Sequence, residues 1–387
     1  MKNHKRLGDY IRAVDVRNRE LKITKPMGIN IDKHFMPSVA NVIGTDLSNY
    51  KLVSKRQFAC NLMHVGRDEK IPMALLTTDE TIIVSPAYFV FEVTNPNILL
   101  PEYLMMWFSR KEFDRNAWFY TDADVRGGMD KDALLDMKLP IPSIERQREI
   151  VAEYETLSRR IDINKQLITK LEATAQALYR KMFVDGIDKE NLPEGWRMGT
   201  LGDVCEISSS KRIFESEYCE EGIPFYRGKE ITQKKKGEQI TDLIYISRKR
   251  YNELVRNYGR PMCGDILLTA VGTIGNSYMV ENEDFYFKDG NLVWFHDFSN
   301  IGVNYYIYEY MQGKYFDKAI SEMAIGSTQK AITIQSLLSL EILVPNSSIL
   351  REFANMAHVI YRNLQIQKEE NSKLTELQSL LLAKMGR

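Results

Sequence analysis

Basic and aromatic side chains are concentrated between Arg227 and Arg260, where their chemistry is easiest to interpret. These 34 residues hold ten Lys or Arg against four acids, a net charge of +6, with tyrosines interleaved. Lys and Arg neutralise phosphates, while Arg and Tyr also reach base edges. The pattern is typical of a nucleic-acid contact, with a solvated charged face as the alternative. The basic residues assigned to this contact are Arg227, Lys229, Lys234, Lys235, Lys236, Arg248, Lys249 and Arg250.

Two further stretches carry candidate nucleic-acid contacts. Asn61, His64 and Arg67 lie in a thinner basic stretch of the N-terminal half. The turn Gly272-Thr273-Ile274-Gly275 has the glycines of a phosphate-binding turn, but no lysine follows it as in a nucleotide-binding loop. We therefore interpret Thr273 as part of a turn that approaches DNA.

Motifs for catalysis and metal binding are missing from the sequence. It contains no G-x-G-x-x-G, no G-x4-G-K-[ST], and no Asn-Pro-Pro-aromatic or Asp-Pro-Pro-aromatic tetrapeptide of an amino-methyltransferase. Asp136-Met137-Lys138 has nuclease-like spacing, but Ser339-Leu340-Glu341 stands at the equivalent place of the internal repeat described below, so we interpret it as chance. The five histidines and four cysteines lack metal-ligand spacing. The sequence predicts no catalytic residue, metal or cofactor in this chain.

The composition is typical of a globular protein. Apolar residues make up 44% and charged residues 27% of the 387 residues, and 52 Lys plus Arg balance 52 Asp plus Glu. A nucleic-acid partner would therefore be bound by local patches rather than by bulk charge. The first residues lack the apolar core of a signal peptide, and no apolar stretch is long enough to span a membrane. These features predict a cytoplasmic protein.

The chain contains an internal repeat. Residues 134–182 align with residues 337–385 without a gap, and 13 of the 49 positions are identical. The same offset of 203 pairs Tyr103 with Tyr306 and Phe113-Asp114 with Phe316-Asp317, and both copies contain Leu-Gly-Asp near their start. A helix is expected over 101–113 and over 304–316, because apolar residues recur there at steps of three and four. The short β-like runs of each copy do not reveal their strand order.

The second part of each copy has the spacing of a coiled-coil helix, with mostly apolar residues at alternating steps of four and three. The first helix would span about 57 Å at 1.5 Å per residue. Its seam contains Ile150, Tyr154, Leu157, Ile161, Asn164, Ile168, Leu171 and Leu178. The weaker second seam contains Ile360, Leu364, Leu374 and Leu381. The two seams could pair with each other antiparallel, which places the preceding domains at opposite ends, or each could form a homodimer.

Several motifs recur in a fixed order along the two copies. The second copy has residues 195–196 (GW), 201–203 (LGD), 223–231 (IPFYRGKEI), 264–269 (GDILLT), 272–275 (GTIG) and 326–332 (GSTQKAI). The first copy has residues 84–91 (VSPAYFVF), 139–142 (LPIP) and 145–150 (ERQREI). With these motifs and their duplication, essentially the whole chain resembles the specificity subunit of a type I restriction–modification enzyme.

The resemblance implies an α+β protein with two mixed α/β target recognition domains, residues 1–142 and 185–345. Each is followed by a long spacer helix, residues 143–184 and 346–387, and the helices would form an intramolecular antiparallel coiled coil with pseudo-two-fold symmetry. The first copy has Val125-Arg126-Gly127 where the second has Thr328-Gln329-Lys330. By this comparison Arg126, Gln329 and Lys330 join the candidate DNA contacts.

The resemblance also implies a function and a set of partners. The chain would read an asymmetric bipartite site in double-stranded DNA and dock two methyltransferase subunits and the restriction subunits. S-adenosylmethionine, ATP and Mg would be used by these subunits and not by this chain. The alternatives are a stand-alone two-domain DNA-binding regulator and a coiled-coil protein–protein adaptor. A single-chain fusion of methyltransferase and specificity domains is disfavoured by the missing catalytic tetrapeptide.

Overall fold

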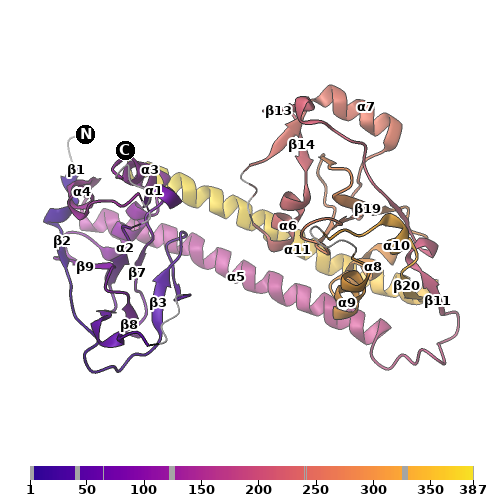
Figure 1. The fold of residues 1–387 in the computed structure, drawn as a ribbon, viewed down its shortest axis with the longest axis horizontal. Coiled ribbons are helices and arrows are strands. Elements are labelled where there is room, and N and C mark those ends of the chain that lie inside the picture. Colours follow the sequence, from indigo (N-terminus) through magenta and orange to yellow (C-terminus); the bar gives the residue numbers. More distant parts are fainter. Residues whose placement is uncertain are drawn as a thin grey trace. The chain divides into compact units, whose positions relative to one another are not determined.

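The computed structural model of the chain describes residues 4–39, 44–63, 65–121, 127–238, 240, 242–324 and 330–386. The chain divides into two compact units. Unit 1 comprises Met1–Ile163 with Asn371–Arg387, and unit 2 comprises Asn164–Glu370. Each unit therefore contains one globular part and a portion of each of the two long helices, α5 and α11 (Figure 1).

The globular part of unit 1 is built from short strands and helices. Its strands are β1 His4–Arg6, β2 Ile11–Ala13, β3 Pro26–Ile29, β4 Phe35–Pro37, β5 Lys51–Val53, β6 Gln57–Cys60, β7 Met73–Leu75, β8 Ile82–Val84, β9 Phe89–Val93 and β10 Lys138–Pro140. Its helices are the 3-10 turns η1 Leu7–Asp9 and η2 Leu47–Asn49, then α1 Val65–Asp68, α2 Pro101–Phe108, α3 Lys111–Phe119 and α4 Lys131–Asp136.

Two four-stranded sheets form the core of this part, with strand orders β2-β9-β6-β7 and β4-β3-β8-β5. In the first sheet, β6 and β9 pair antiparallel with Phe58 opposite Phe91, and their rings stack with centroids 4.9 Å apart. Phe108 of α2 meets the Phe58 ring edge-on. All three rings are fully buried, so α2 is held on this sheet by apolar packing.

The globular part of unit 2 follows the same order of elements with additions. Its strands are β11 Arg197–Thr200, β12 Glu206–Ser208, β13 Tyr218–Cys219, β14 Ile223–Tyr226, β15 Ile244–Ile246, β16 Ile266–Thr269, β17 Ser277–Met279, β18 Tyr286–Phe287, β19 Leu292–His296 and β20 Glu341–Val344. Its helices are η3 Leu201–Asp203, η4 Glu215–Glu217, α6 Gly228–Lys236, α7 Arg248–Tyr258, α8 Val303–Met311, α9 Lys314–Met323 and α10 Ile334–Leu338.

One sheet of unit 2 has the strand order of a sheet of unit 1, and the other retains part of its pairing. The sheet β12-β19-β16-β17 has the strand order of β2-β9-β6-β7. The second sheet, β13-β15-β14-β18, keeps one parallel pair, β14 with β18, as β3 pairs parallel with β8 in unit 1. The hydrogen bonds also repeat: Tyr103 Oη donates to the carbonyl of Pro140 at 3.2 Å, and Tyr306 Oη to that of Leu343 at 2.6 Å. The offset of 203 residues therefore relates equivalent places in the fold.

The helix expected over 101–113 is in fact two helices. α2 ends at Phe108 and α3 begins at Lys111, with Ser109 and Arg110 between them. The expectation over 304–316 was wrong in the same way, because α8 ends at Met311 and α9 begins at Lys314. Apolar residues recur at steps of three and four across both helix breaks, because the two helices of each pair pack into the same hydrophobic core.

The two long helices are α5 Ile144–Phe183 and α11 Ser347–Lys384. In unit 2, Phe183 at the end of α5 packs edge-on against Phe353 near the start of α11, with ring centroids 5.1 Å apart. In unit 1, Ile150 near the start of α5 and Met385, just beyond the end of α11, belong to one buried cluster. The helices therefore run antiparallel, as the fold class predicted.

The seam residues named from the sequence are all buried or half-buried. The polar seam residue Asn164 is 1% exposed, and its Nδ2 donates to Glu370 Oε2 of α11 at 3.0 Å. A buried amide is costly unless it is hydrogen-bonded. The opposite helix therefore supplies the partner that allows a polar residue at this position.

A search of the described residues found no helix that is both long and apolar enough to cross a membrane.

Candidate nucleic-acid interface

In each unit, two segments that are far apart in the sequence lie side by side, and they occupy equivalent places in the two copies. In unit 1 the amide of Met129 donates to the carbonyl of Leu62 at 2.9 Å, which holds the segment before α4 against the segment that follows β6. In unit 2 the amide of Ile332 donates to the carbonyl of Ala270 at 2.9 Å. Residues 129 and 332 differ by the repeat offset. We call the paired segments the platform: residues 61–63 and 65–72 with 127–129 in unit 1, and residues 270–276 with 330–332 in unit 2.

The platform contains most of the candidates outside the basic segment. Asn61 and Arg67 lie in the unit 1 platform, and Thr273 and Lys330 in that of unit 2. Arg67 is exposed and pairs with the adjacent Asp68, whereas Asn61 Oδ1 accepts from the amide of Met63 at 3.0 Å. His64, Arg126 and Gln329 lie outside the described residues.

Two glycines that the sequence analysis did not single out bring the unit 1 segments together. The Gly66 amide donates to the Gly127 carbonyl at 2.8 Å. A Cβ added to Gly66 would lie 2.8 Å from Gly127 Cα, and Gly127 has a φ of +58°, in the left-handed region. This part of the platform therefore has room only for glycine at both positions. A glycine facing another glycine in the fold leaves no local sequence signal.

Helix α6 is hydrogen-bonded to the unit 2 platform, and its N-terminus is capped by the residue that precedes it. Asn276 Nδ2 donates to Thr232 Oγ1 of α6 at 3.0 Å. At the start of the helix, the fully buried Glu230 accepts from the backbone amide of Arg227 at 2.7 Å and from its guanidinium at 2.6 Å. Burial acts to raise the pKa of Glu230, but the hydrogen bonds of Arg227 hold it below its usual value. Arg227 thus caps α6 from a half-buried position.

Lys234 is also turned inward. Its Nζ lies between the rings of Tyr226 and Tyr278, 5.2 and 4.8 Å from their centroids. It donates to both carboxylate oxygens of Glu283, at 2.9 and 2.8 Å, and its side chain is 19% exposed. An ion pair with this little exposure is only weakly screened by solvent. The charge of Lys234 is therefore already balanced within the protein.

The other cations of the basic segment are more accessible. Lys229 pairs with Asp242 at 2.9 Å, Arg248 with Asp284 at 3.7 Å, and Lys236 with Glu238 at 3.9 Å. Exposed pairs of this kind contribute about 0–1 kcal/mol, so a phosphate can replace the acid at little cost. Arg250 is half-buried and bridges Glu217 and Glu253. Lys249 and Lys330 are exposed and have no ion pair among the described residues. Lys235 is also exposed, but partial desolvation lowers its pKa, and the nearby charge of Asp317 acts against this shift.

Unit 1 exposes aromatic rings beside its platform, another feature that the sequence analysis missed. Trp118, Phe119 and Tyr120 end helix α3 and are 49%, 80% and 54% exposed. They directly precede Thr121, which forms a β-bridge with Met129 of the platform. Exposed aromatic rings can make apolar contacts to base edges, such as the methyl group of thymine. Their signal in the sequence is the run of three consecutive aromatic residues, which is absent at 321–323 of the second copy.

The side chains that could take part in catalysis or bind a metal are held by hydrogen bonds and ion pairs within the protein, or are buried. Asp136 accepts from Arg6 Nε at 2.6 Å in an exposed ion pair. Among the described residues, one group could hold a metal by proximity: Glu206, His296 and Asp297. His296 Nδ1 pairs with Asp297 at 2.8 Å and Nε2 with Ser208 at 2.8 Å, so both ring nitrogens have protein partners. Burial raises the pKa of the Cys60 thiol to about 12, as expected for an inert cysteine.

Two globular parts built on one plan, each packed on both of two antiparallel helices, define a duplicated recognition protein. Residues 72–173 and 193–376 match the family model of the type I restriction modification DNA specificity domain, and the chain belongs to this family. The resemblance drawn from the sequence is thereby confirmed.

Individual relatives agree with this assignment. The chain is 28% identical over 266 residues to a putative type I restriction enzyme specificity subunit of Haemophilus influenzae, in an alignment that spans 66% of each protein. It is 21% identical over 380 residues to the HindI specificity subunit of the same organism, spanning 79% of this chain and 81% of that one. The crystal structure of the type I restriction–modification S subunit from M. genitalium matches 99% of this chain and 96% of its own, with a TM-score of 0.61 and 16% identity, which supports the fold.

Proposed function

We propose that the two globular parts each read one half of an asymmetric bipartite site in double-stranded DNA, and that α5 and α11 set the gap between the halves. The observation that carries this proposal is the platform. It is present in both units at equivalent positions, but its surroundings differ: basic helices in unit 2 and aromatic rings in unit 1. One scaffold with two different surfaces suits a site whose halves differ in sequence.

Binding would divide between phosphate and base contacts. The exposed Lys235, Lys249 and Lys330 of unit 2 suit phosphates, which fix the position of a protein on DNA without reading sequence. Thr273, at the turn of the platform, is exposed and can reach a base edge. In unit 1 the rings of Trp118–Tyr120 supply apolar contacts to base edges, such as the methyl group of thymine.

As a specificity subunit the chain is non-catalytic, and its partners supply the chemistry. Two methyltransferase subunits would dock on it with S-adenosylmethionine, and restriction subunits would join with ATP and Mg. Family membership supports these partners. A stand-alone regulator would instead bind its site tightly without them, and an adaptor would not bind DNA at all. Measuring DNA binding with and without the methyltransferase subunit separates these alternatives.

The spacer role can be tested by lengthening both helices. Four residues inserted after Ile163 and four after Glu370 add about 6 Å of helix, which corresponds to about two base pairs at about 3.4 Å each. The methylome of cells expressing this variant with the methyltransferase subunit should show both half-sites unchanged and a longer gap. Four residues inserted in the loop 186–195 serve as the control and should leave the gap unchanged. A methylated site of unaltered gap in the double-insertion strain contradicts the proposal.

A further inference from the structure

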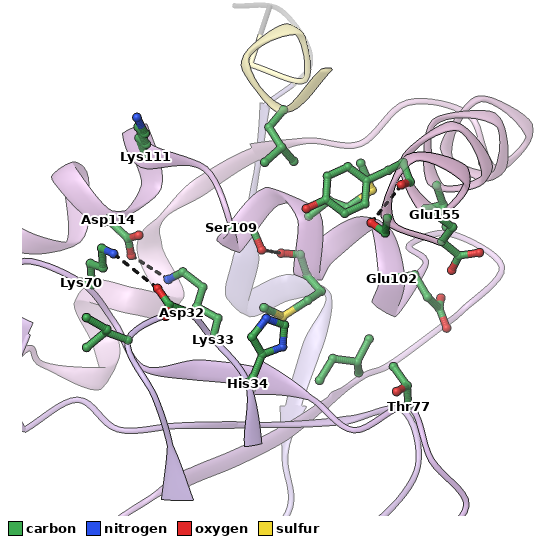
Figure 2. A pocket seen from close by; sticks show the side chains of 18 residues that line it. Asp32, Lys33, His34, Lys70, Thr77, Glu102, Ser109, Lys111, Asp114 and Glu155 are labelled. Carbon is green, nitrogen blue, oxygen red and sulfur yellow. Dashed lines mark hydrogen bonds and ion pairs between the residues drawn. The ribbon is translucent and has the colours of Figure 1, made fainter. Parts of the chain in front are cut away.

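A buried ion pair joins three elements of unit 1 that are far apart in the sequence. Lys33 lies in the turn between β3 and β4, and its Nζ donates to Asp114 Oδ1 of helix α3 at 2.7 Å (Figure 2). Lys33 is 7% exposed and Asp114 is 9% exposed. The same Nζ donates to the carbonyl of Ile71 at 2.9 Å, and Asp114 Oδ1 accepts from the amide of Ile71 at 3.2 Å. The pair therefore connects the turn and α3 to the platform segment that contains Ile71.

The backbone of Ile71 depends on this pair for its hydrogen bonds. Ile71 is fully buried and lies outside the strands, and a buried amide or carbonyl needs a partner. Two side chains here supply what a neighbouring strand supplies in a sheet. Burial lowers the pKa of Lys33, and the charge of Asp114 opposes this shift. Because desolvation offsets much of the attraction in a buried ion pair, the pair is better explained by the backbone that it places than by added stability.

The turn between β3 and β4 has little packing beneath it. Ile31, Asp32 and His34 are exposed and line a cavity of about 600 Å³ that also reaches α2 and α5 (Figure 2). Another ion pair of the turn joins Asp32 to Lys70 at 4.0 Å, but it is exposed and screened by solvent. Lys33 therefore attaches the turn to the rest of unit 1 where packing does not.

Helix α3 links this pair to the exposed aromatic rings. Asp114 lies about one helical turn before Trp118, the first of the three rings. The helix meets the platform at two places: Asp114 bonds to Ile71, and Thr121, just beyond the helix, forms a β-bridge with Met129. Ile71 and Met129 belong to the two different segments of the platform. A shift of α3 at Asp114 would therefore move the rings relative to the platform.

Unit 2 holds its platform in a different way. At the repeat offset of 203, Asp114 corresponds to Asp317, which is exposed. The turn of the unit 2 platform is held instead by Thr269, which is fully buried. The Thr269 hydroxyl accepts from the amide of Asn276 at 2.9 Å and donates to the carbonyl of Thr273. A neutral hydroxyl thus does in unit 2 what the ion pair does in unit 1.

We propose that Lys33 and Asp114 are positioning residues that determine how selectively unit 1 reads its half-site. Neither residue contacts DNA. They hold Ile71 and α3 so that the platform and the rings meet the base edges in one fixed arrangement. The proposal rests on the proposed function, because it requires that unit 1 reads one half of the site. It adds which buried side chains make that reading selective.

The test measures discrimination between DNA sequences rather than affinity. The chain assembled with its methyltransferase subunit is titrated with three labelled duplexes: the site methylated in cells, and two versions with one base pair changed in one or the other half. The affinity ratio of a changed duplex to the unchanged one does not depend on the fraction of folded protein, because that fraction scales both affinities equally. A purely structural role therefore leaves both ratios unchanged.

Four variants separate the two units. Asp114→Asn should reduce discrimination at one half by at least about fivefold, the smallest usual effect of one wrong base pair, and leave the other half unchanged. Lys33→Met with Asp114→Leu removes both charges and should do the same, even if the unpaired Lys33 makes Asp114→Asn fold poorly. Thr269→Val should reduce discrimination at the opposite half. Lys55→Met with Asp79→Leu makes the same change at an exposed pair and should alter neither half.

Two results would overturn the proposal. One is unchanged discrimination at both halves by folded Lys33→Met with Asp114→Leu, and the other is an equal loss at both halves. A wild-type complex that discriminates at neither half would instead contradict the proposed function itself.

Discussion

The two globular parts share their sheets and their platform but differ in the connections between strands. In unit 1 a short turn joins β3 to β4, whereas in unit 2 helix α6 lies between β14 and β15, and α7 follows before β16. These two helices carry seven of the eight basic residues assigned to DNA contact, and the eighth, Arg227, precedes α6. The difference indicates that the sheets and long helices form a constant scaffold, while inserted elements supply what each unit presents to DNA.

The largest expected effect comes from removing the carboxylate that anchors α6. Glu230→Ala leaves a half-buried Arg227 without its partner, and breaking a buried pair costs about 3–5 kcal/mol. We expect urea unfolding to show a loss in this range for unit 2. Asp79→Ala in unit 1 is the control, since its pair with Lys55 is largely exposed and should cost less than about 1 kcal/mol. Equal losses would mean that α6 is not specifically anchored.

The stability of unit 2 is expected to depend on pH, because Glu309 stands where unit 1 has Met106. Burial raises the pKa of Glu309 to about 7, opposed by hydrogen bonds from Tyr361 and Gln176. The folded carboxyl therefore keeps its proton above the pH at which the unfolded one loses it. Stability falls as pH rises from about 4.5 to about 7, by about 3 kcal/mol at about 1.4 kcal/mol per pKa unit.

Glu309→Gln should remove this dependence. Chemical unfolding of unit 2 at pH 5 and pH 8 measures it, and Met106→Leu in unit 1 should leave the wild-type profile unchanged. A Glu309→Gln profile that still falls by the wild-type amount would assign the dependence to another group.

The aromatic surface of unit 1 should matter for DNA affinity rather than for stability. Phe119→Ala removes a ring that is 80% exposed, and burying such a side chain at an interface contributes about 1.5–3 kcal/mol. We expect roughly tenfold weaker binding of the cognate site by the assembled methyltransferase, with an unchanged melting temperature. Leu380→Ala on α11, a similarly exposed apolar position, should not alter affinity. Unchanged binding by Phe119→Ala would exclude the ring from the interface.

The smallest effect concerns individual lysines of α6. Lys235→Ala with Lys236→Ala should lower the slope of log affinity against log salt by about 1–2, at about 0.9 per lost phosphate contact. Lys234→Ala should leave the slope unchanged, because its charge is balanced by Glu283, and should lower stability instead. A flatter slope for Lys234→Ala would show that this ion pair opens on DNA.

The sequence predicted the features that depend on local spacing. The repeat follows from aligning the sequence with itself at an offset of 203. The seams of α5 and α11 follow from residues three and four apart, so both features could be identified without a structure. The strand order could not be predicted, because strands of two to five residues pair across long separations, as Ile11 pairs with Val93. The basic segment was identified as a unit, but Lys234 turns inward to Glu283, a partner 49 residues away. The contact of Gly66 with Gly127 likewise depends on folding.

The most direct test of independent reading is a domain exchange. Residues 191–345 would be replaced by the equivalent part of a related specificity subunit, and the methylome of cells expressing the hybrid with the methyltransferase subunit would be sequenced. If each unit reads its own half-site and the long helices set the spacing, one half of the methylated site changes while the other half and the gap stay the same. A change in both halves would contradict the account.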